Sequence, residues 1–164
     1  MTVELTAEPR LGQTSVRVLP GTSAAERVGA AFGLTLPDAV GLTAASGPHT
    51  ALWLGPDEWL VVTETGADVP PPGGMLLPGE RGLVVDVSAN RTTLTLSGPS
   101  AREVLEKGCP VDLHERSFTP GRAVVTTLAR VPVILWQIAP AAYRLLPRTS
   151  FAAYVTRWLH DAMP

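Results

Sequence analysis

The histidine and cysteine side chains are the first candidates for metal binding or nucleophilic catalysis in this sequence. His49, His114 and His160 are far apart, and none has a second histidine or a cysteine at the spacing of a zinc site. Cys109 ends a predicted helix with no adjacent base, so a small buried hydrophobic residue is favoured over a nucleophile. We therefore expect no metal site and no catalytic residue in this chain.

Carboxylates are the second class of candidate. Asp57 and Glu58 are adjacent at a predicted hairpin tip, and neighbouring side chains point apart in extended chain, so a turn or interface role is favoured over acid–base catalysis. Asp86 interrupts the apolar segment LVVDVS. Three explanations stay open for Asp86: it faces solvent by simple alternation, it pairs with Arg91, or it binds a ligand. It is the weak candidate for a cofactor-binding residue.

Composition excludes several classes of function. The chain has 13 basic and 15 acidic residues, a net charge of −2 and a single lysine, Lys107, so it lacks the basic stripe of a nucleic-acid-binding protein. No apolar run approaches the roughly 18 residues of a membrane helix. The first ten residues, MTVELTAEPR, do not resemble a signal peptide. One cysteine allows no internal disulfide, which fits a cytoplasmic location.

The low charge content indicates a protein that contacts partners. Charged residues are 17% of the chain, against about 25% in typical soluble proteins. Exposed apolar surface usually marks an interface, so we expect the chain expressed alone to self-associate. Tryptophan is a frequent interface anchor. The residues predicted to contact partners are Trp53, Pro56, Asp57, Glu58, Trp59 and Trp136.

The first half of the chain predicts a strand, a helix and a hairpin. Residues 13–19 alternate polar and apolar side chains, and residues 50–63 form two apolar arms around a Pro-Asp turn. Ser23 and Glu26 have capping-box spacing before a helix at 24–32, which Gly33 should end. Residues 34–48 are expected to be loop.

The second half predicts a similar order of elements. A hairpin is expected over 83–88 and 91–97, and a helix at 101–107 ends at Gly108. Apolar side chains at helical spacing predict an amphipathic helix at 150–162, with Trp158 in the core. Three further strands are expected at 122–129, 132–138 and 142–146.

An internal repeat organises these elements. The segment VRVLPGTSAAERV is echoed by LTLSGPSAREVL. We predict an α+β fold of two β-α-β-β, ferredoxin-like units with mostly antiparallel sheet and a C-terminal amphipathic helix. Residues 1–164 would form one domain of two halves, 11–65 and 82–164, joined by a Pro/Gly-rich connection at 66–81.

Four segments of the sequence together point to a known family. The longest is VVDVSANRTTLTLSGPSAREVLEKGCPVDLHERSF at 84–118. The others are WLGPDEWLVV at 53–62, TPGRA at 119–123 and RTSFAAYVTRWLHDA at 148–162. Together they resemble the gamma subunit of heterotetrameric sarcosine oxidase. The resemblance covers residues 11 to 162, without the Pro/Gly connection.

The resemblance implies an accessory role without catalysis by this chain alone. Enzymes of this kind oxidatively demethylate sarcosine to glycine and pass a one-carbon unit to tetrahydrofolate. The resemblance implies that FAD, FMN, NAD and zinc are held by the alpha, beta and delta partner subunits. It also implies a fold similar to the folate-binding part of the aminomethyltransferase family, with no cofactor bound by the gamma subunit.

Two departures from the family pattern leave other functions open. An extra residue precedes Ser150, and Ala89-Asn90 replace a more polar turn. One alternative is a gamma-type subunit of a related N-methyl amino acid dehydrogenase. The implied fold leaves a second alternative open, a free-standing folate-binding or one-carbon module, for which Asp86 would be the acid to test.

Overall fold

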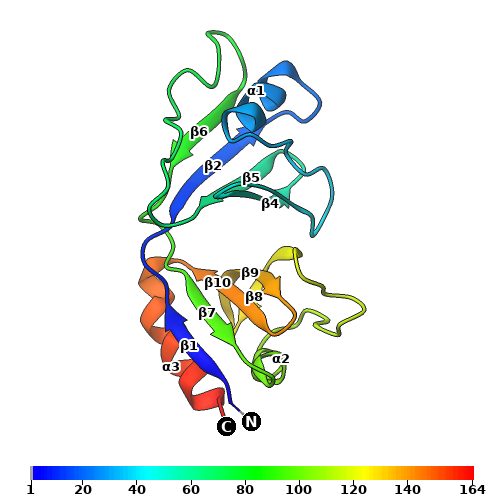
Figure 1. Cartoon of the computed structure of the whole chain (residues 1–164), viewed down its shortest axis with the longest axis vertical. Coiled ribbons are helices and arrows are strands. Elements are labelled where there is room, and N and C mark those ends of the chain that lie inside the picture. Colours follow the sequence, from blue (N-terminus) through cyan, green and yellow to red (C-terminus); the bar gives the residue numbers. More distant parts are fainter. Residues whose placement is uncertain (1) are drawn as a thin grey trace. The chain divides into compact units, whose positions relative to one another are not determined.

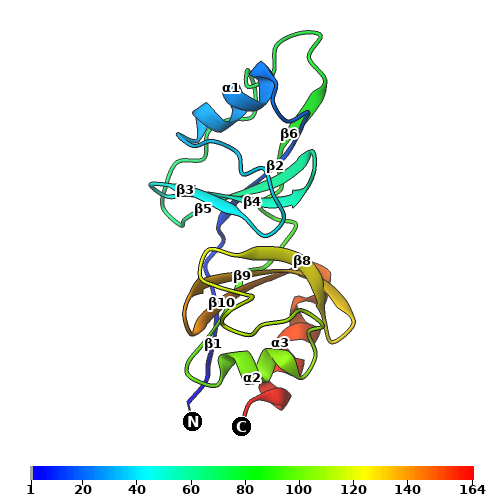
Figure 2. The same ribbon diagram turned by 90° about the vertical axis from the view of Figure 1, so that its right-hand side faces the viewer.

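The computed structural model describes residues 2–164, which divide into two compact units. The middle unit is Leu11–Ser88, and the terminal unit combines the N-terminal segment to Arg10 with Ala89–Pro164. Each unit contains a five-stranded antiparallel sheet with its helices on one face (Figures 1 and 2). The predicted α+β class with mostly antiparallel sheet is confirmed.

The middle unit has one helix, α1 (Ser23–Ala31), on a sheet of order β3-β4-β5-β2-β6. The core lies where Val28 and Phe32 pack against Val16, Trp59 and Val61. The predicted hairpin at 50–63 is confirmed, since β4 pairs with β5. The strands are β2 (Gly12–Val18), β3 (Thr43–Ser46), β4 (His49–Gly55), β5 (Glu58–Thr63) and β6 (Gly82–Asp86).

Helix α1 starts one residue earlier than the capping-box prediction. Thr22, not Ser23, is the N-cap, and its Oγ1 accepts a hydrogen bond from Ala25 N at 3.3 Å. The predicted end at Gly33 is confirmed: Gly33 N donates to Ala30 O and Leu34 N to Gly29 O, the paired bonds of a Schellman motif.

In the terminal unit two helices cover one face of the sheet, whose strand order is β1-β7-β10-β9-β8. Val104 and Leu105 of α2 (Ala101–Glu106) and Val155 and Leu159 of α3 (Ala152–Ala162) are buried in one cluster with the strands. A short 3₁₀ turn, η1 (Thr149–Phe151), precedes α3. The strands are β1 (Glu4–Ala7), β7 (Leu94–Ser97), β8 (Ala123–Leu128), β9 (Val131–Ala139) and β10 (Ala142–Pro147).

Two expectations for the strands were wrong. The predicted hairpin of 83–88 with 91–97 does not form, because β6 pairs with β2 and β7 pairs with β1 and β10. The expected loop at 34–48 contains β3, which pairs with β4. Residues 66–81 belong to the middle unit, and the chain passes between the two units twice, after Arg10 and after Ser88.

Candidate functional site

The tip of the β4–β5 hairpin is the exposed part of the predicted partner surface. Pro56 and Asp57 are exposed, and the Asp57 carbonyl accepts a hydrogen bond from Val18 N at 3.2 Å. Glu58 forms an ion pair with Arg17 at 2.8 Å, with the two side chains partly solvated. The carboxylate of Glu58 is therefore held by Arg17 at the surface of the sheet, which fits a structural role at the turn better than acid–base catalysis.

The tryptophans named as partner contacts differ in burial. Trp59 is 2% exposed, and its Nε1 donates to Pro37 O at 2.7 Å. Trp136 is 7% exposed, and the Arg144 guanidinium lies 5.2 Å from the centre of its ring. Trp53 is half-buried and packs against the core of the middle unit. The indole of Trp59 thus fills the core of the middle unit, whereas Trp136 is buried beside Arg144, and the partner role of this set stays a prediction.

Strand β6 is the edge of the middle sheet and carries exposed apolar side chains. The side chains of Leu83 and Val85, two positions apart, lie on the same face of the strand and are 55% and 37% exposed. Asp86 at its end is exposed, and its Oδ1 accepts from Ser88 N at 2.9 Å and Ser88 Oγ at 2.6 Å. Asp86 therefore closes a local Asx turn. An edge strand with apolar side chains is a common site of protein association.

The histidines and Cys109 do not gather into a reactive cluster. His49 Nδ1 lies 2.9 Å from Thr63 Oγ1, and its ring meets the Phe32 ring edge to face. His114 Nδ1 accepts from Arg116 N at 3.2 Å. Cys109 is buried in the core of the terminal unit. Within residues 2–164, no group of three or more His, Cys, Asp or Glu residues could hold a metal ion.

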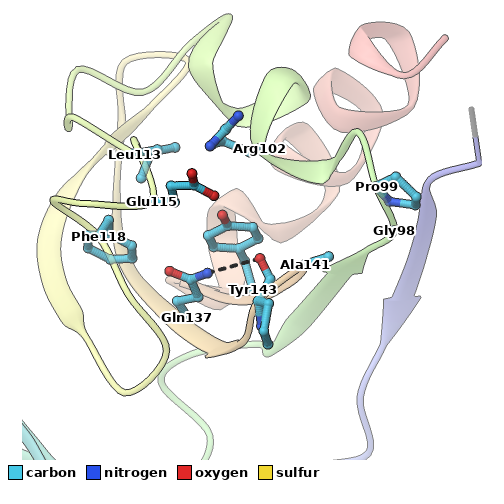
Figure 3. Close-up of a pocket in the computed structure, with 10 residues that line it drawn as sticks. Gly98, Pro99, Arg102, Leu113, Glu115, Phe118, Gln137, Ala141 and Tyr143 are labelled. Atoms are coloured by element: carbon cyan, nitrogen blue, oxygen red, sulfur yellow. Dashed lines mark hydrogen bonds between the residues drawn. The ribbon is translucent and has the colours of Figure 1, made fainter.

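A polar cavity of about 200 Å³ opens in the terminal unit, and no residue spacing in the sequence points to it. Figure 3 shows Arg102 of α2, Glu115 of the following loop, Gln137 of β9 and Tyr143 of β10 around it. These residues come from four separate segments. One signal was present in the sequence: Gln137 is a polar residue inside the apolar strand VPVILWQIA.

The phenol of Tyr143 in this cavity is protonated at neutral pH. Tyr143 is 2% exposed as a residue, and its burial raises the pKa of the hydroxyl above the ordinary value of 10.0. The positive charge of Arg102 opposes this pKa shift, and the negative charge of Glu106 adds to it. The Tyr143 hydroxyl therefore stays protonated at neutral pH and can donate a hydrogen bond.

A second cavity, of about 400 Å³, lies in the middle unit between α1 and the segment that follows it. Its lining includes Ala25 and Ala30 of α1, and Leu34, Leu36 and Trp59. The lining is mainly apolar. Glu26 and Asp38 are the charged residues at this cavity.

Comparison with solved structures defines the class of fold. The chain is similar to glycine cleavage system aminomethyltransferase T from Bartonella henselae, with a TM-score of 0.67 over 96% of this chain and 45% of that one. The sequence identity is 13%, so this likeness concerns the fold alone. The predicted aminomethyltransferase-like fold is thereby confirmed.

Closer relatives identify the family within that fold. The model of the "Sarcosine oxidase, gamma subunit family" matches residues 19–164. The sarcosine oxidase gamma subunit of Arthrobacter sp. is 45% identical over 92% of this chain and 75% of its own length. That of Corynebacterium sp. (strain P-1) is 44% identical over 99% of this chain and 80% of its own. The chain belongs to the sarcosine oxidase gamma subunit family.

One solved structure extends the likeness to three dimensions. A chain of the heterotetrameric sarcosine oxidase from Corynebacterium sp. U-96, solved in complex with pyrrole 2-carboxylate, gives a TM-score of 0.88 at 41% identity. The match covers 98% of this chain and 83% of that chain. No helix among residues 2–164 is long and apolar enough to cross a membrane.

Proposed function

We propose that this chain is the gamma subunit of a heterotetrameric sarcosine oxidase and acts as an accessory subunit without catalysis of its own. The observation that carries this proposal is the match to the gamma subunit family over residues 19–164, joined to a TM-score of 0.88 with a chain of such an enzyme. The complex would oxidatively demethylate sarcosine to glycine and transfer the one-carbon unit to tetrahydrofolate in the cytoplasm.

The partner subunits would supply the chemistry in this proposal. FAD, FMN and NAD would be held by the alpha and beta subunits and zinc by the delta subunit, with none bound by this chain. A free-standing folate-binding module is not favoured, because the relatives that match nearly the whole chain are oxidase gamma subunits. A subunit of another N-methyl amino acid dehydrogenase is not favoured for the same reason.

The partner surface would lie on the middle unit. Its hairpin tip exposes Pro56 and Asp57, and its edge strand exposes Leu83 and Val85. Burying an exposed leucine side chain against a partner stabilises association by about 1.5–3 kcal/mol.

Co-expression with the alpha, beta and delta subunits of one organism tests the proposal. A tag on this chain should capture all three partners in equal amounts, and the captured complex should oxidise sarcosine. The proposal would be overturned if the chain stayed a well-behaved monomer that retained none of the partners.

Two matched variants test the partner surface. Leu83→Lys should weaken capture of the partners roughly tenfold or more, because it places a charge in an apolar contact. Val125→Lys is the control, since Val125 is 56% exposed in the terminal unit. Equal capture by both variants, each with unchanged thermal stability, would remove β6 from the proposed surface.

A further inference from the structure

The polar cavity of the terminal unit has walls held in place by the backbone. Gly98 N donates to Ala141 O at 2.9 Å, which joins the start of the α2 turn to the β9–β10 turn. Gln137 N donates to Arg122 O at 2.9 Å, and Gly121 N donates to Gln137 O at 2.8 Å. The side chains that face the cavity are therefore anchored by ordered segments, which reduces the entropy that a ligand must lose on binding.

Gln137 presents an acceptor that no protein group satisfies. Its Nε2 donates to Pro140 O at 3.1 Å, and a carbonyl can only accept, so the orientation of the amide is fixed (Figure 3). The Oε1 atom is then the free end of a side chain that is 3% exposed, and it has no hydrogen-bond partner among the described residues. The Gln137 side chain therefore forms a fixed part of the cavity wall.

The cavity is also lined by one basic and one acidic side chain, Arg102 and Glu115. Arg102 projects from the first turn of α2 and Glu115 from the loop before Phe118, and Figure 3 shows both side chains on the same side of the cavity as the Tyr143 hydroxyl. Arg102 and the protonated Tyr143 hydroxyl are donors, which suit a carboxylate. Glu115 is an exposed acceptor, which suits an ammonium or secondary amine.

The loop that carries Glu115 is itself ordered. Asp112 accepts a hydrogen bond from His114 N at 3.0 Å, and Phe118 N donates to His114 O at 2.9 Å. The hydrogen bonds from Ser117 and His114 lower the pKa of Asp112, so this carboxylate stays charged and keeps the turn together at neutral pH. Phe118 supplies an apolar wall beside the polar groups.

We propose that this cavity binds a small zwitterionic amino acid, with its carboxylate at Arg102 and Tyr143 and its nitrogen at Glu115. The volume of about 200 Å³ is below the roughly 300–1,000 Å³ of sites for drug-sized molecules, so the ligand is small. This site would give the chain a ligand of its own, in addition to the accessory role proposed above.

Titration of the full chain with glycine, followed by ¹H–¹⁵N NMR, tests the proposal. Saturable shifts are expected at the Gln137 side-chain amide and at the Gly98 and Ala141 backbone amides. Acetate, which lacks the nitrogen, and glycine betaine, whose nitrogen has no hydrogen, should each bind at least tenfold more weakly than glycine. If either binds as well as glycine, or if glycine gives no saturable shift at these three residues, the proposal is wrong.

Two variants and a control keep the test specific. Arg102→Gln and Tyr143→Phe should each raise the Kd for glycine about tenfold, and Tyr143→Phe removes one atom from a packed ring. Glu103→Gln is the control, because Glu103 is an exposed acid on α2 that does not line the cavity. Equal affinity in the wild-type chain and both site variants, or the same loss in Glu103→Gln, would overturn the assignment.

Discussion

The two units of this chain share a strand–turn–helix segment but use their sheets differently. In the terminal unit two helices cover one face of the sheet, and the buried cluster draws on strands, α2 and α3. In the middle unit one helix covers a smaller cluster. Most of the large apolar side chains that are exposed belong to the middle unit: Leu19, Val40, Leu42, Leu77, Leu83 and Val85, against Val125, Phe151 and Tyr154 in the terminal unit.

We infer from this difference that the two units bind different kinds of molecule. The terminal unit combines a well-covered core with a cavity of mixed charge, which suits a small polar ligand. The middle unit exposes apolar side chains on an edge strand and near its turns, which suits a protein partner. The proposals for partner binding and for ligand binding therefore rest on different units and can fail separately.

The largest effect is expected from deleting the aromatic anchor of the smaller core. Phe32 is 2% exposed at the end of α1, and its ring contacts His49. Phe32→Ala should lower the free energy of unfolding by about 3–5 kcal/mol, because it leaves a cavity under the only helix of the middle unit. Phe151→Ala is the control, since Phe151 is 40% exposed. Urea unfolding measures both, and equal small losses would show that the middle core tolerates the cavity.

The two glycines before the helices should differ in their tolerance of alanine. Gly98 has φ of 118°, and an added Cβ would collide with the Thr2 carbonyl oxygen. Gly21 has φ of 73° and no atom within 4 Å of an added Cβ. Gly98→Ala should cost about 3 kcal/mol from strain and overlap together, and Gly21→Ala about 1 kcal/mol from strain. Thermal unfolding that ranks them in the opposite order would contradict this account of the turns.

Loss of the buried hydrogen bond from Trp59 to Pro37 should have a smaller effect on the free energy of unfolding. Trp59→Phe keeps an aromatic ring in the core but leaves the Pro37 carbonyl without its donor. The expected loss is about 1–3 kcal/mol in the free energy of unfolding. Trp53→Phe on the paired strand position is the control, with a half-buried indole. If the two variants lose the same stability, the Nε1 bond is not what sets the cost at Trp59.

The smallest effect is a pH dependence at the surface of the middle unit. The hydrogen bond from Arg27 holds the pKa of Glu80 below its ordinary value of 4.5. A lowered pKa stabilises the fold above the unfolded-state pKa, and this contribution is lost as the pH falls through the folded-state pKa. Arg27→Gln should therefore be less stable than wild type at neutral pH, with the difference shrinking in acid.

Carboxyl NMR titration checks the cause of that pH dependence. In Arg27→Gln the pKa of Glu80 should rise towards 4.5, while the pKa of Asp112, which Ser117 and His114 lower, should not move. A Glu80 pKa that stayed lowered in the variant would assign the shift to the Leu77 backbone hydrogen bond instead.

Local patterns in the sequence predicted the elements well where they carry their own signals. Alternation and turn residues located β2, β4, β5, β8, β9 and β10, and helical spacing located α3. The pairing of β6 was missed because strands separated by a short polar turn favour a hairpin. The true partner of β6, strand β2, lies far away in the sequence, and no local pattern encodes such a pairing.

The cavity of the terminal unit could not be predicted for a related reason. Arg102 and Glu115 look like ordinary surface residues, and Tyr143 looks like a core aromatic in a strand. Only the sheet register and the course of the 109–121 loop bring them together. The family, by contrast, could be predicted, because the block at 84–118 is long enough to be specific, and the comparisons confirm it.

Hydrogen–deuterium exchange of the chain alone and in the reconstituted oxidase complex tests the central claim most directly. We expect slower exchange in the complex at β6 and at the hairpin tip of residues 55–58. Residues around the Gln137 cavity should exchange at the same rate in both states. Slower exchange confined to the terminal unit, or identical exchange throughout, would contradict the claim that the middle unit contacts the partners.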